Sequence, residues 1–170
     1  MIQRLRVPLG FVAAGVVLYF ASPTTESLVI GIPIAALGLI FRVLAAGVIK
    51  KDSRLAISGA YAWTRNPLYF GTFLLVAGFA VMSANIGLAV LLVGSAAFVY
   101  SHVIGKEEAH LNKLFPDQFR SYRSKVPAFF PRIRRGEWDF SFRQYAANRE
   151  YNAALGFAAM LGLFLLKWFR

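Results

Sequence analysis

The chain has 170 residues, of which 58% are hydrophobic and only 16% charged, and its formal net charge is +11. This excess of apolar residues over a typical soluble domain indicates a membrane protein. The chain has no cysteine, which excludes disulfides, thiolate metal sites and a cysteine nucleophile. Because the basic residues cluster between apolar runs, we expect membrane lipids as partners and no nucleic acid.

Apolar runs long enough, or nearly long enough, to cross a bilayer occur five times, where a span needs roughly 20 residues. They cover about residues 7–21, 27–49, 68–84, 86–104 and 153–169. We therefore predict an all-α fold, an integral membrane bundle of about five transmembrane helices in one domain over residues 1–170. A cytosolic segment at about 105–152 is expected between helices four and five. The first run lacks a clear cleavage site and is interpreted as a helix rather than a secretory signal.

The connections between the spans predict their orientation. The turns at 22–26 and 83–85 contain no lysine or arginine, whereas the segments at 50–65 and 105–152 are rich in both. The positive-inside rule then places the N-terminus and both basic segments in the cytosol, and we expect the inner membrane of a bacterium. Lys167 runs against the rule at the far end of the last helix.

Arg42 lies inside the second span, where an arginine costs roughly 2.5 kcal/mol or more at the bilayer centre. One interpretation is that its side chain snorkels to the nearby interface. The other is that it faces the bundle, where it binds an anionic group or pairs with Glu107 or Glu108. The second interpretation makes Arg42 a candidate substrate-binding residue.

The third span begins with an arginine, an asparagine and a proline. Pro67 suits a first helical position, where its missing N–H is not required, and Asn66 is then placed as the N-cap. The helix N-terminus beside Arg65 predicts a small anion site for a carboxylate or phosphate. The alternative is an ordinary cap next to a positive-inside arginine.

Glu107 and Glu108 lie near the cytosolic end of the fourth span, which we expect to continue as helix until Pro116. Adjacent carboxylates are unfavourable near a helix C-terminus, so a cationic ligand, Arg65 or Arg42 should compensate them. The alternative is a solvated charged turn. No zinc-ligand spacing is present, and we predict no metal site.

The rest of the cytosolic segment mixes aromatic and basic residues. Phe119 and Tyr122 predict a short amphipathic turn, and prolines 127 and 131 predict extended chain. Aromatic residues expected at headgroup depth follow, at positions 138, 140, 142 and 145. Asn148 is a candidate cap for the last helix, which is otherwise assigned only a packing role.

Two sequence blocks resemble a known family. "GAYAWTRNPLYFGTFL", from Gly59, is similar to the G-x-Y-x-x-x-R-[HN]-P-x-Y-x-G signature of the isoprenylcysteine carboxyl methyltransferases and their bacterial relatives. "EEAHLNKLFPDQFRSYRSKVPAFFP", ending at Pro131, resembles that family's E-E-x-x-L, F-G, Y-x-x-Y and V-P elements. Asn66 stands where eukaryotic members have histidine, Pro116 replaces the usual glycine, and Phe119 replaces the first tyrosine. Val103 lies where some members carry arginine.

The resemblance implies a membrane bundle that binds S-adenosylmethionine on its cytosolic side and takes a lipophilic substrate from the bilayer. By matching position it implies catalytic roles for Arg65 and Glu107, and substrate contacts for Arg65, to which Arg42 is added from its place in the span. The implied cofactor-binding residues are Asn66, Pro67, Tyr69, Gly71, Glu107, Glu108, Leu111 and Tyr122.

Methyl transfer from a sulfonium needs alignment and charge neutralisation rather than acid–base chemistry, which suits a chain without a recognisable triad. We therefore expect S-adenosylmethionine-dependent methyl transfer to an isoprenoid or lipid-borne acceptor, with a carboxylate as the receiving group. The alternatives are an NADPH-dependent membrane sterol-type reductase, a phospholipid amine N-methyltransferase and a non-catalytic membrane scaffold. The sequence does not indicate an oligomeric state.

Overall fold

The computed structural model describes residues 14–50 and 53–170, and these residues form helices and loops without a strand. After a helical stretch at 14–20, the elements are α2 (Thr25–Ala46), η1 (Gly59–Ala62), α3 (Pro67–Met82), α4 (Ile86–Leu114), α5 (Pro116–Lys125), α6 (Phe142–Ala147) and α7 (Tyr151–Trp168). Helices α2, α4 and α7 are long and apolar enough to cross a membrane, and α3 is a shorter apolar helix. The prediction of an all-α membrane bundle is confirmed. The first predicted span, 7–21, lies partly outside the described residues.

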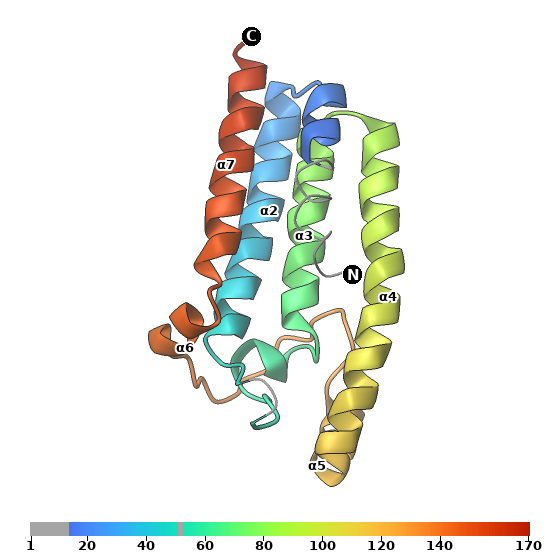
Figure 1. Cartoon of the computed structure of the whole chain (residues 1–170), viewed down its shortest axis with the longest axis vertical. Helices are drawn as coiled ribbons and strands as arrows, with labels where there is room; N and C mark the ends of the chain where they lie inside the picture. Colours follow the sequence, from blue (N-terminus) through green and yellow to red (C-terminus); the bar gives the residue numbers. More distant parts are fainter. Residues whose placement is uncertain (1–13, 51–52) are drawn as a thin grey trace, which may run out of the picture.

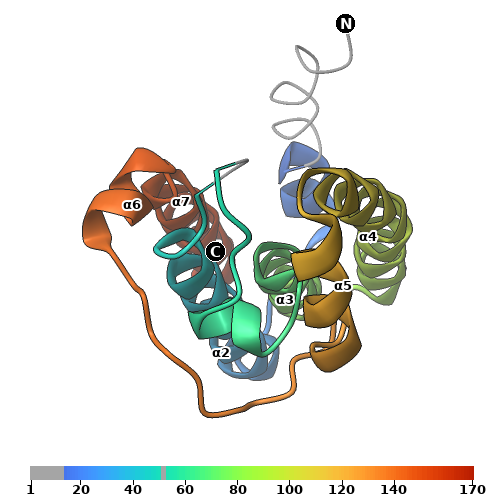
Figure 2. The ribbon, with the colours of Figure 1, turned by 90° about the horizontal axis from the view of Figure 1, so that it is seen from below.

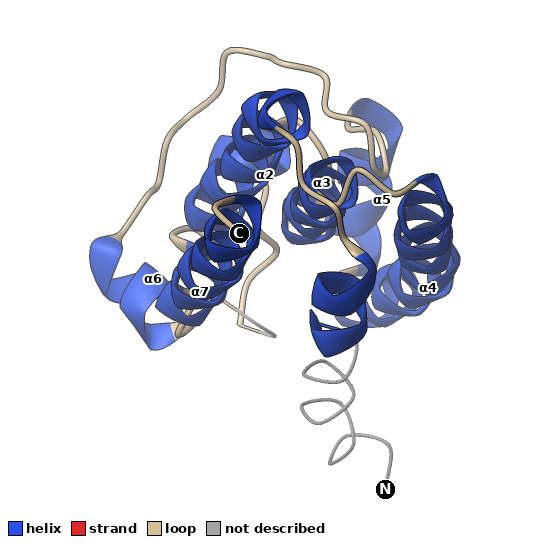
Figure 3. Cartoon of the chain, turned by 90° about the horizontal axis from the view of Figure 1, so that it is seen from above, coloured by secondary structure: helices blue, strands red, loops and turns tan. Residues whose placement is uncertain are grey.

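Four long helices stand side by side in the order α7, α2, α3, α4 (Figure 1). Helices α5 and α6 lie at the lower end of the bundle, together with η1, while the C-terminus lies at the upper end. The view from above shows that every described element with regular structure is a helix (Figure 3). The polar groups discussed below gather at the lower end, which is the end predicted to be cytosolic.

Local capping explains where the helices begin. Thr24 and Ser27 form a capping box at the start of α2, and the Asn85 side chain accepts a hydrogen bond from the Leu88 N–H at the start of α4. Pro116 ends α4 as predicted but also opens α5, because proline at the first helical position gives up no required hydrogen bond. The predicted turn around Phe119 is therefore a ten-residue helix.

Glycines bring the backbones of α2 and α3 together. A Cβ built on Gly38 would lie 2.5 Å from the Gly71 carbonyl oxygen, and one built on Gly78 would lie 2.7 Å from the Gly31 carbonyl oxygen. Small residues allow such close approach between membrane helices, where van der Waals packing replaces the hydrophobic effect. Gly71 also contacts Arg42, so this interface fixes the place of the arginine on α2.

A loop over residues 126–141, here called the strap, joins α5 to α6 and arcs around the lower end of the bundle (Figure 2). Backbone hydrogen bonds of 2.9 Å tie it to the chain preceding α3 and to the end of α2: Arg65 N–H to Pro127 O, Arg132 N–H to Trp63 O, Gly59 N–H to Glu137 O, and Ser141 N–H to Gly47 O. Gly59 has φ +57°, a conformation that favours glycine at this bend. The chain around the two prolines is not helical, but it bends at residues 128–130, where extended chain was predicted.

Asn148 does not cap the last helix, and that prediction was wrong. It is the C-cap residue of α6, and its side-chain amide donates to the carbonyl oxygens of Ala46 at 2.8 Å and Ile49 at 3.1 Å. Asn148 thereby holds α6 against the end of α2 and the chain that follows it, and it gives the last carbonyl of α2 a partner.

Candidate functional site

Arg65 connects the entrance of α3 to α4 and α5. Its Nη2 lies 2.9 Å from Glu108 Oε1, and its Nη1 donates to the Arg123 carbonyl oxygen at 3.2 Å. The two side chains of the ion pair are only 9% and 16% exposed. Arg65 Nε is buried without a hydrogen-bond partner among the described residues, so one donor of the guanidinium remains unused.

Asn66 occupies the N-cap position of α3 and Pro67 its first turn, as predicted. The side chain of Asn66 does not cap the helix, however, because its Nδ2 donates to the Ala128 carbonyl oxygen at 2.8 Å. The neighbouring Thr64 hydroxyl, fully buried, donates to the Phe129 carbonyl oxygen at 2.9 Å. Both polar side chains therefore hold the strap, and the first-turn amides of α3 are left uncapped by Asn66.

The adjacent glutamates have different surroundings. Glu108 pairs with Arg65, which confirms the expectation that a cation from the first block compensates this part of α4. Glu107 is exposed and has no ion pair among the described residues. The alternative interpretation of the two glutamates, a solvated charged turn, therefore applies to Glu107 and not to Glu108.

Two tyrosines of this region, Tyr61 and Tyr122, are buried. The Tyr122 hydroxyl donates to the Tyr61 carbonyl oxygen at 2.7 Å, which connects α5 to η1. Burial raises the pKa of Tyr122; the nearby Arg65 opposes this shift and Glu108 adds to it. Burial also raises the pKa of Tyr61, with smaller contributions from Tyr122 and from the negative charge of Glu107.

Tyr61 lies within electrostatic range of carboxylates from two sides, since Glu150 as well as Glu107 contributes to its raised pKa. The signature block contains Tyr61, but the sequence analysis gave it no role. Its burial could have been suspected only from a fold that brings η1 to the lower ends of α2 and α3, against α5.

Arg42 faces the bundle rather than the interface. It forms an ion pair with Glu150, just before α7, and donates a hydrogen bond to the Thr72 hydroxyl on α3. The predicted pairing with Glu107 or Glu108 was wrong, because the N-terminal end of α7 supplies the carboxylate instead. Arg42 Nε is buried without a hydrogen-bond partner among the described residues. Glu150 was not among the predicted site residues. Its position in the sequence, as an acidic residue at the start of an apolar helix, could have indicated it.

The remaining predicted residues are structural neighbours of these groups. Gly71 packs against α2, Leu111 packs against the buried cluster of Phe119 and Tyr122, and the Tyr69 ring lies 5.6 Å from that of Tyr100. The close approach expected at Gly71 is therefore one between helices.

Two surface pockets, of about 570 and 300 Å³, lie beside the strap, and neither is lined by Arg65 or Glu108. The ion pairs rather than these openings define the candidate site, because charges buried together from separate elements are costly and cluster at functional sites. In the described part of the chain, no three His, Asp or Glu side chains gather in a group that could hold a metal ion.

Comparisons with known proteins identify relatives of the chain. The family model described as phospholipid methyltransferase matches residues 12–118, more than half of the chain. The cobalt-zinc-cadmium resistance protein CzcN of Cupriavidus metallidurans is 31% identical over 70% of this chain and 56% of its own length. The nickel-cobalt-cadmium resistance protein NccN of Alcaligenes xylosoxydans xylosoxydans is 37% identical over 49% of this chain and 39% of its own length.

A protein-S-isoprenylcysteine O-methyltransferase of Schizosaccharomyces pombe is 33% identical over 56% of this chain and 41% of its own length. The chain thus spans between about two fifths and just over half the length of these curated relatives. No solved structure matches.

Proposed function

Because the chain belongs to the phospholipid methyltransferase family, we propose that it transfers a methyl group from S-adenosylmethionine to a lipophilic acceptor at the cytosolic face of a membrane. The observation that best supports this is the ion pair between Arg65 and Glu108, because it joins the two motif blocks at one place. Family membership favours methyl transfer over the reductase and scaffold alternatives.

The residues around this ion pair fit the charges of S-adenosylmethionine, which carries a sulfonium, an ammonium and a carboxylate. The exposed carboxylate of Glu107 can receive a cation, and the ring of Tyr69 can add a cation–π contact. The first turn of α3, which no side chain caps, can receive the carboxylate beside the positive charge of Arg65. Among the supporting residues, Pro67 starts α3, and Asn66 and Tyr122 tie down the strap and η1.

When bound, S-adenosylmethionine supplies a methyl group that its sulfonium charge already activates. The protein's own contribution is then to align the acceptor and exclude water, and it needs no general base. Arg65 is held by Glu108 and by the Arg123 carbonyl oxygen, so its guanidinium is fixed in position before a ligand arrives. Such preorganisation is what a charged orienting group requires.

Arg42 is our candidate for contact with the acceptor. It lies on the apolar helix α2, near its lower end, and its side chain is 21% exposed, so a lipid-borne molecule can approach it. Its pairing with Glu150 keeps the guanidinium inside the bundle rather than at the surface. A carboxylate on the acceptor would match the charge of Arg42.

We also propose that the lower end of the bundle faces the cytosol of a bacterium, with the protein in the inner membrane. The strap and α5 carry six of the ten basic residues between positions 105 and 152, and the positive-inside rule keeps such a segment in the cytosol. Trypsin added to inside-out membrane vesicles should cut at the exposed Arg134 or Arg135, whereas intact spheroplasts should be protected. Cleavage only in spheroplasts would reverse the orientation.

Calorimetric titration of detergent-purified protein tests the cofactor. We expect binding of S-adenosylmethionine and of S-adenosylhomocysteine by the wild type. Glu107→Gln should weaken the binding of S-adenosylmethionine more than the binding of S-adenosylhomocysteine, because only the methyl donor has a sulfonium. Asp117→Asn, an equally exposed acidic position on α5, is the matched control and should bind normally. No heat of binding with millimolar ligand would contradict the proposal, and binding of NADPH instead would favour the reductase.

The acceptor is tested with radiolabelled S-adenosylmethionine and membrane extracts. A methyl ester releases volatile methanol on alkaline treatment, whereas a methylated amine does not. Base-labile label in the lipid fraction would support a carboxylate acceptor. Base-stable label would identify the phospholipid amine alternative, which the matched family model also covers.

A further inference from the structure

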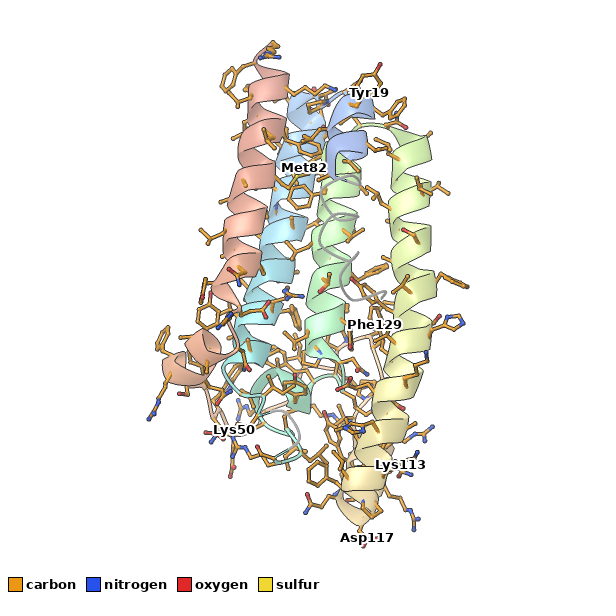
Figure 4. The ribbon with its side chains drawn as sticks, viewed as in Figure 1. Tyr19, Lys50, Met82, Lys113, Asp117 and Phe129 are labelled. Carbon is orange, nitrogen blue, oxygen red and sulfur yellow. The ribbon has the colours of Figure 1, made fainter. Side chains whose placement is uncertain are left out.

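A pocket of about 300 Å³ opens where the end of α2 meets α6. It is separate from the Arg65–Glu108 ion pair, and its charged lining residues are Lys50, Arg54, Arg143 and Asp139. Figure 4 labels Lys50 below the lower end of α2, on the same side of the bundle as α6. The methyl-transfer proposal uses none of these residues.

The pocket carries an excess of positive charge. Arg54 and Asp139 form an ion pair and so offset one another. Lys50 and Arg143 have no ion pair in the part of the chain that the structure describes. A lysine and an arginine that line one opening suit a phosphodiester, since lysine acts as a point charge and arginine can donate two parallel hydrogen bonds.

The level at which the pocket lies in the bilayer favours a lipid as the source of that anion. The apolar helix α2 ends at Ala46, and the pocket begins with Gly47. Asn148 fixes α6 at this same level by its hydrogen bonds to Ala46 and Ile49. The pocket therefore lies where the hydrocarbon region of a bilayer gives way to headgroups.

Aromatic and apolar side chains around the pocket support this position. Phe142 on α6 is 78% exposed, and Trp138 on the strap is 52% exposed, although both are large hydrophobic residues. Exposed aromatic rings are typical of the membrane interface. Ile40 on α2 and Leu155 on α7 are also exposed, so apolar surface is available to acyl chains on the two helices that lead away from the pocket.

From these observations we propose that the pocket between α2 and α6 binds the headgroup of an anionic phospholipid, with Lys50 and Arg143 as its cationic ligands. The lipid would be a bound component and not the methyl acceptor, because the pocket lies apart from Arg65 and Glu108. It would also hold α6, and with it the start of α7, against α2. The proposal does not depend on methyl transfer.

The test measures lipid retention by native mass spectrometry and the thermal unfolding of the detergent-purified protein. Phosphatidylglycerol, phosphatidylcholine and inorganic phosphate are added separately. We expect phosphatidylglycerol to bind and stabilise at lower concentration than phosphatidylcholine. Since each Lys or Arg near an anionic surface contributes about fivefold, Lys50→Gln/Arg143→Gln should bind phosphatidylglycerol about 30-fold more weakly.

The matched control is Arg120→Gln/Lys125→Gln on α5, which removes one arginine and one lysine from exposed positions outside the pocket. This control should keep the wild-type preference for phosphatidylglycerol. Equal binding by the pocket variant and the control would overturn the proposal, and so would a wild type without preference between the two lipids. Stabilisation by inorganic phosphate as strong as that by phosphatidylglycerol would also overturn it, because the site would then serve a soluble anion.

Discussion

Arg42 on α2 and Glu150 at the start of α7 form an ion pair inside the lower half of the bundle, although most of the chain separates them in sequence. Their side chains are 21% and 11% exposed. The Thr72 hydroxyl adds a hydrogen bond from α3. One arginine therefore connects three helices, and α7, which has few other buried residues, is held at its N-terminal end by a charge.

Removing one partner of this ion pair should destabilise the protein. Arg42→Met leaves the Glu150 carboxylate largely buried without a cation, a change that typically costs about 3–5 kcal/mol. Because both groups keep some exposure, we expect about 3 kcal/mol. Thermal unfolding in detergent should show a large loss for Arg42→Met and for Glu150→Gln, and the double variant should lose less than the sum.

The exposed ion pair between Arg54 and Asp139 is the control for this cycle, with side chains 45% and 55% exposed. Arg54→Met should cost less than about 1 kcal/mol, because solvent screens such pairs. If the double variant lost as much stability as the two single variants together, Arg42 and Glu150 would not stabilise one another.

Close packing of α2 against α3 gives a second prediction. Gly78→Ala would place a Cβ 2.6 Å from the Ala35 Cβ and 2.7 Å from the Gly31 carbonyl oxygen, both on α2. Since neither neighbour is a flexible side-chain end, the helices must separate and the protein should unfold at lower temperature. Gly156→Ala on α7 has no atom within 4 Å of its new Cβ and is the matched control.

The control should be neutral or slightly stabilising, because alanine favours a helix over glycine by up to about 1 kcal/mol. If the melting temperatures of the two alanine variants shifted equally, the interhelical contact would have no special role.

The sequence predicted the helices well, because apolar runs and the prolines at positions 67 and 116 leave little choice of secondary structure. It also predicted that a cation would meet the glutamates, since Arg65 and Glu108 lie at the same end of antiparallel helices. It could not predict that Glu150 pairs with Arg42. That pairing depends on which helix packs beside α2, and apolar faces of similar composition do not specify their neighbours.

The side-chain roles of Asn66 and Asn148 were mistaken for a related reason. An asparagine next to a helix predicts a cap, because local hydrogen bonds are the default for its short amide. Both asparagines instead donate to carbonyl oxygens of distant segments, at Ala128 and Ala46 respectively. The strap and the end of α2 supply those acceptors, and no local sequence pattern encodes which distant carbonyl each asparagine meets.

Thr64 provides a third prediction, about the strap. Its buried hydroxyl donates to the Phe129 carbonyl oxygen at 2.9 Å, and Figure 4 labels Phe129 between the lower parts of α3 and α4. Thr64→Val keeps the shape but leaves a carbonyl without its donor, at a cost of about 1–3 kcal/mol. We expect faster trypsin cleavage at the exposed arginines of the strap. Ser124→Ala, at an exposed hydroxyl on α5, should be cut at the wild-type rate.

The buried tyrosines predict how stability changes at high pH. Burial raises the pKa of Tyr122 in the folded protein above the value near 10 that it has when unfolded. Below pH 10 both states hold the proton; above it only the unfolded state loses the proton, so the free energy of unfolding falls as pH rises. Tyr61 acts in the same direction.

Tyr122→Phe isolates this effect. At pH 8 the variant should be less stable by about 1 kcal/mol, because it lacks the hydrogen bond to the Tyr61 carbonyl oxygen. Above pH 10 the wild type loses stability by ionisation of the unfolded tyrosine, which phenylalanine cannot undergo, so the difference should shrink. Unfolding temperatures of both proteins between pH 8 and about 11 measure it. If this difference stayed constant or grew, Tyr122 would ionise at least as readily in the folded protein as in the unfolded one. That outcome would contradict the raised pKa expected from its burial against η1.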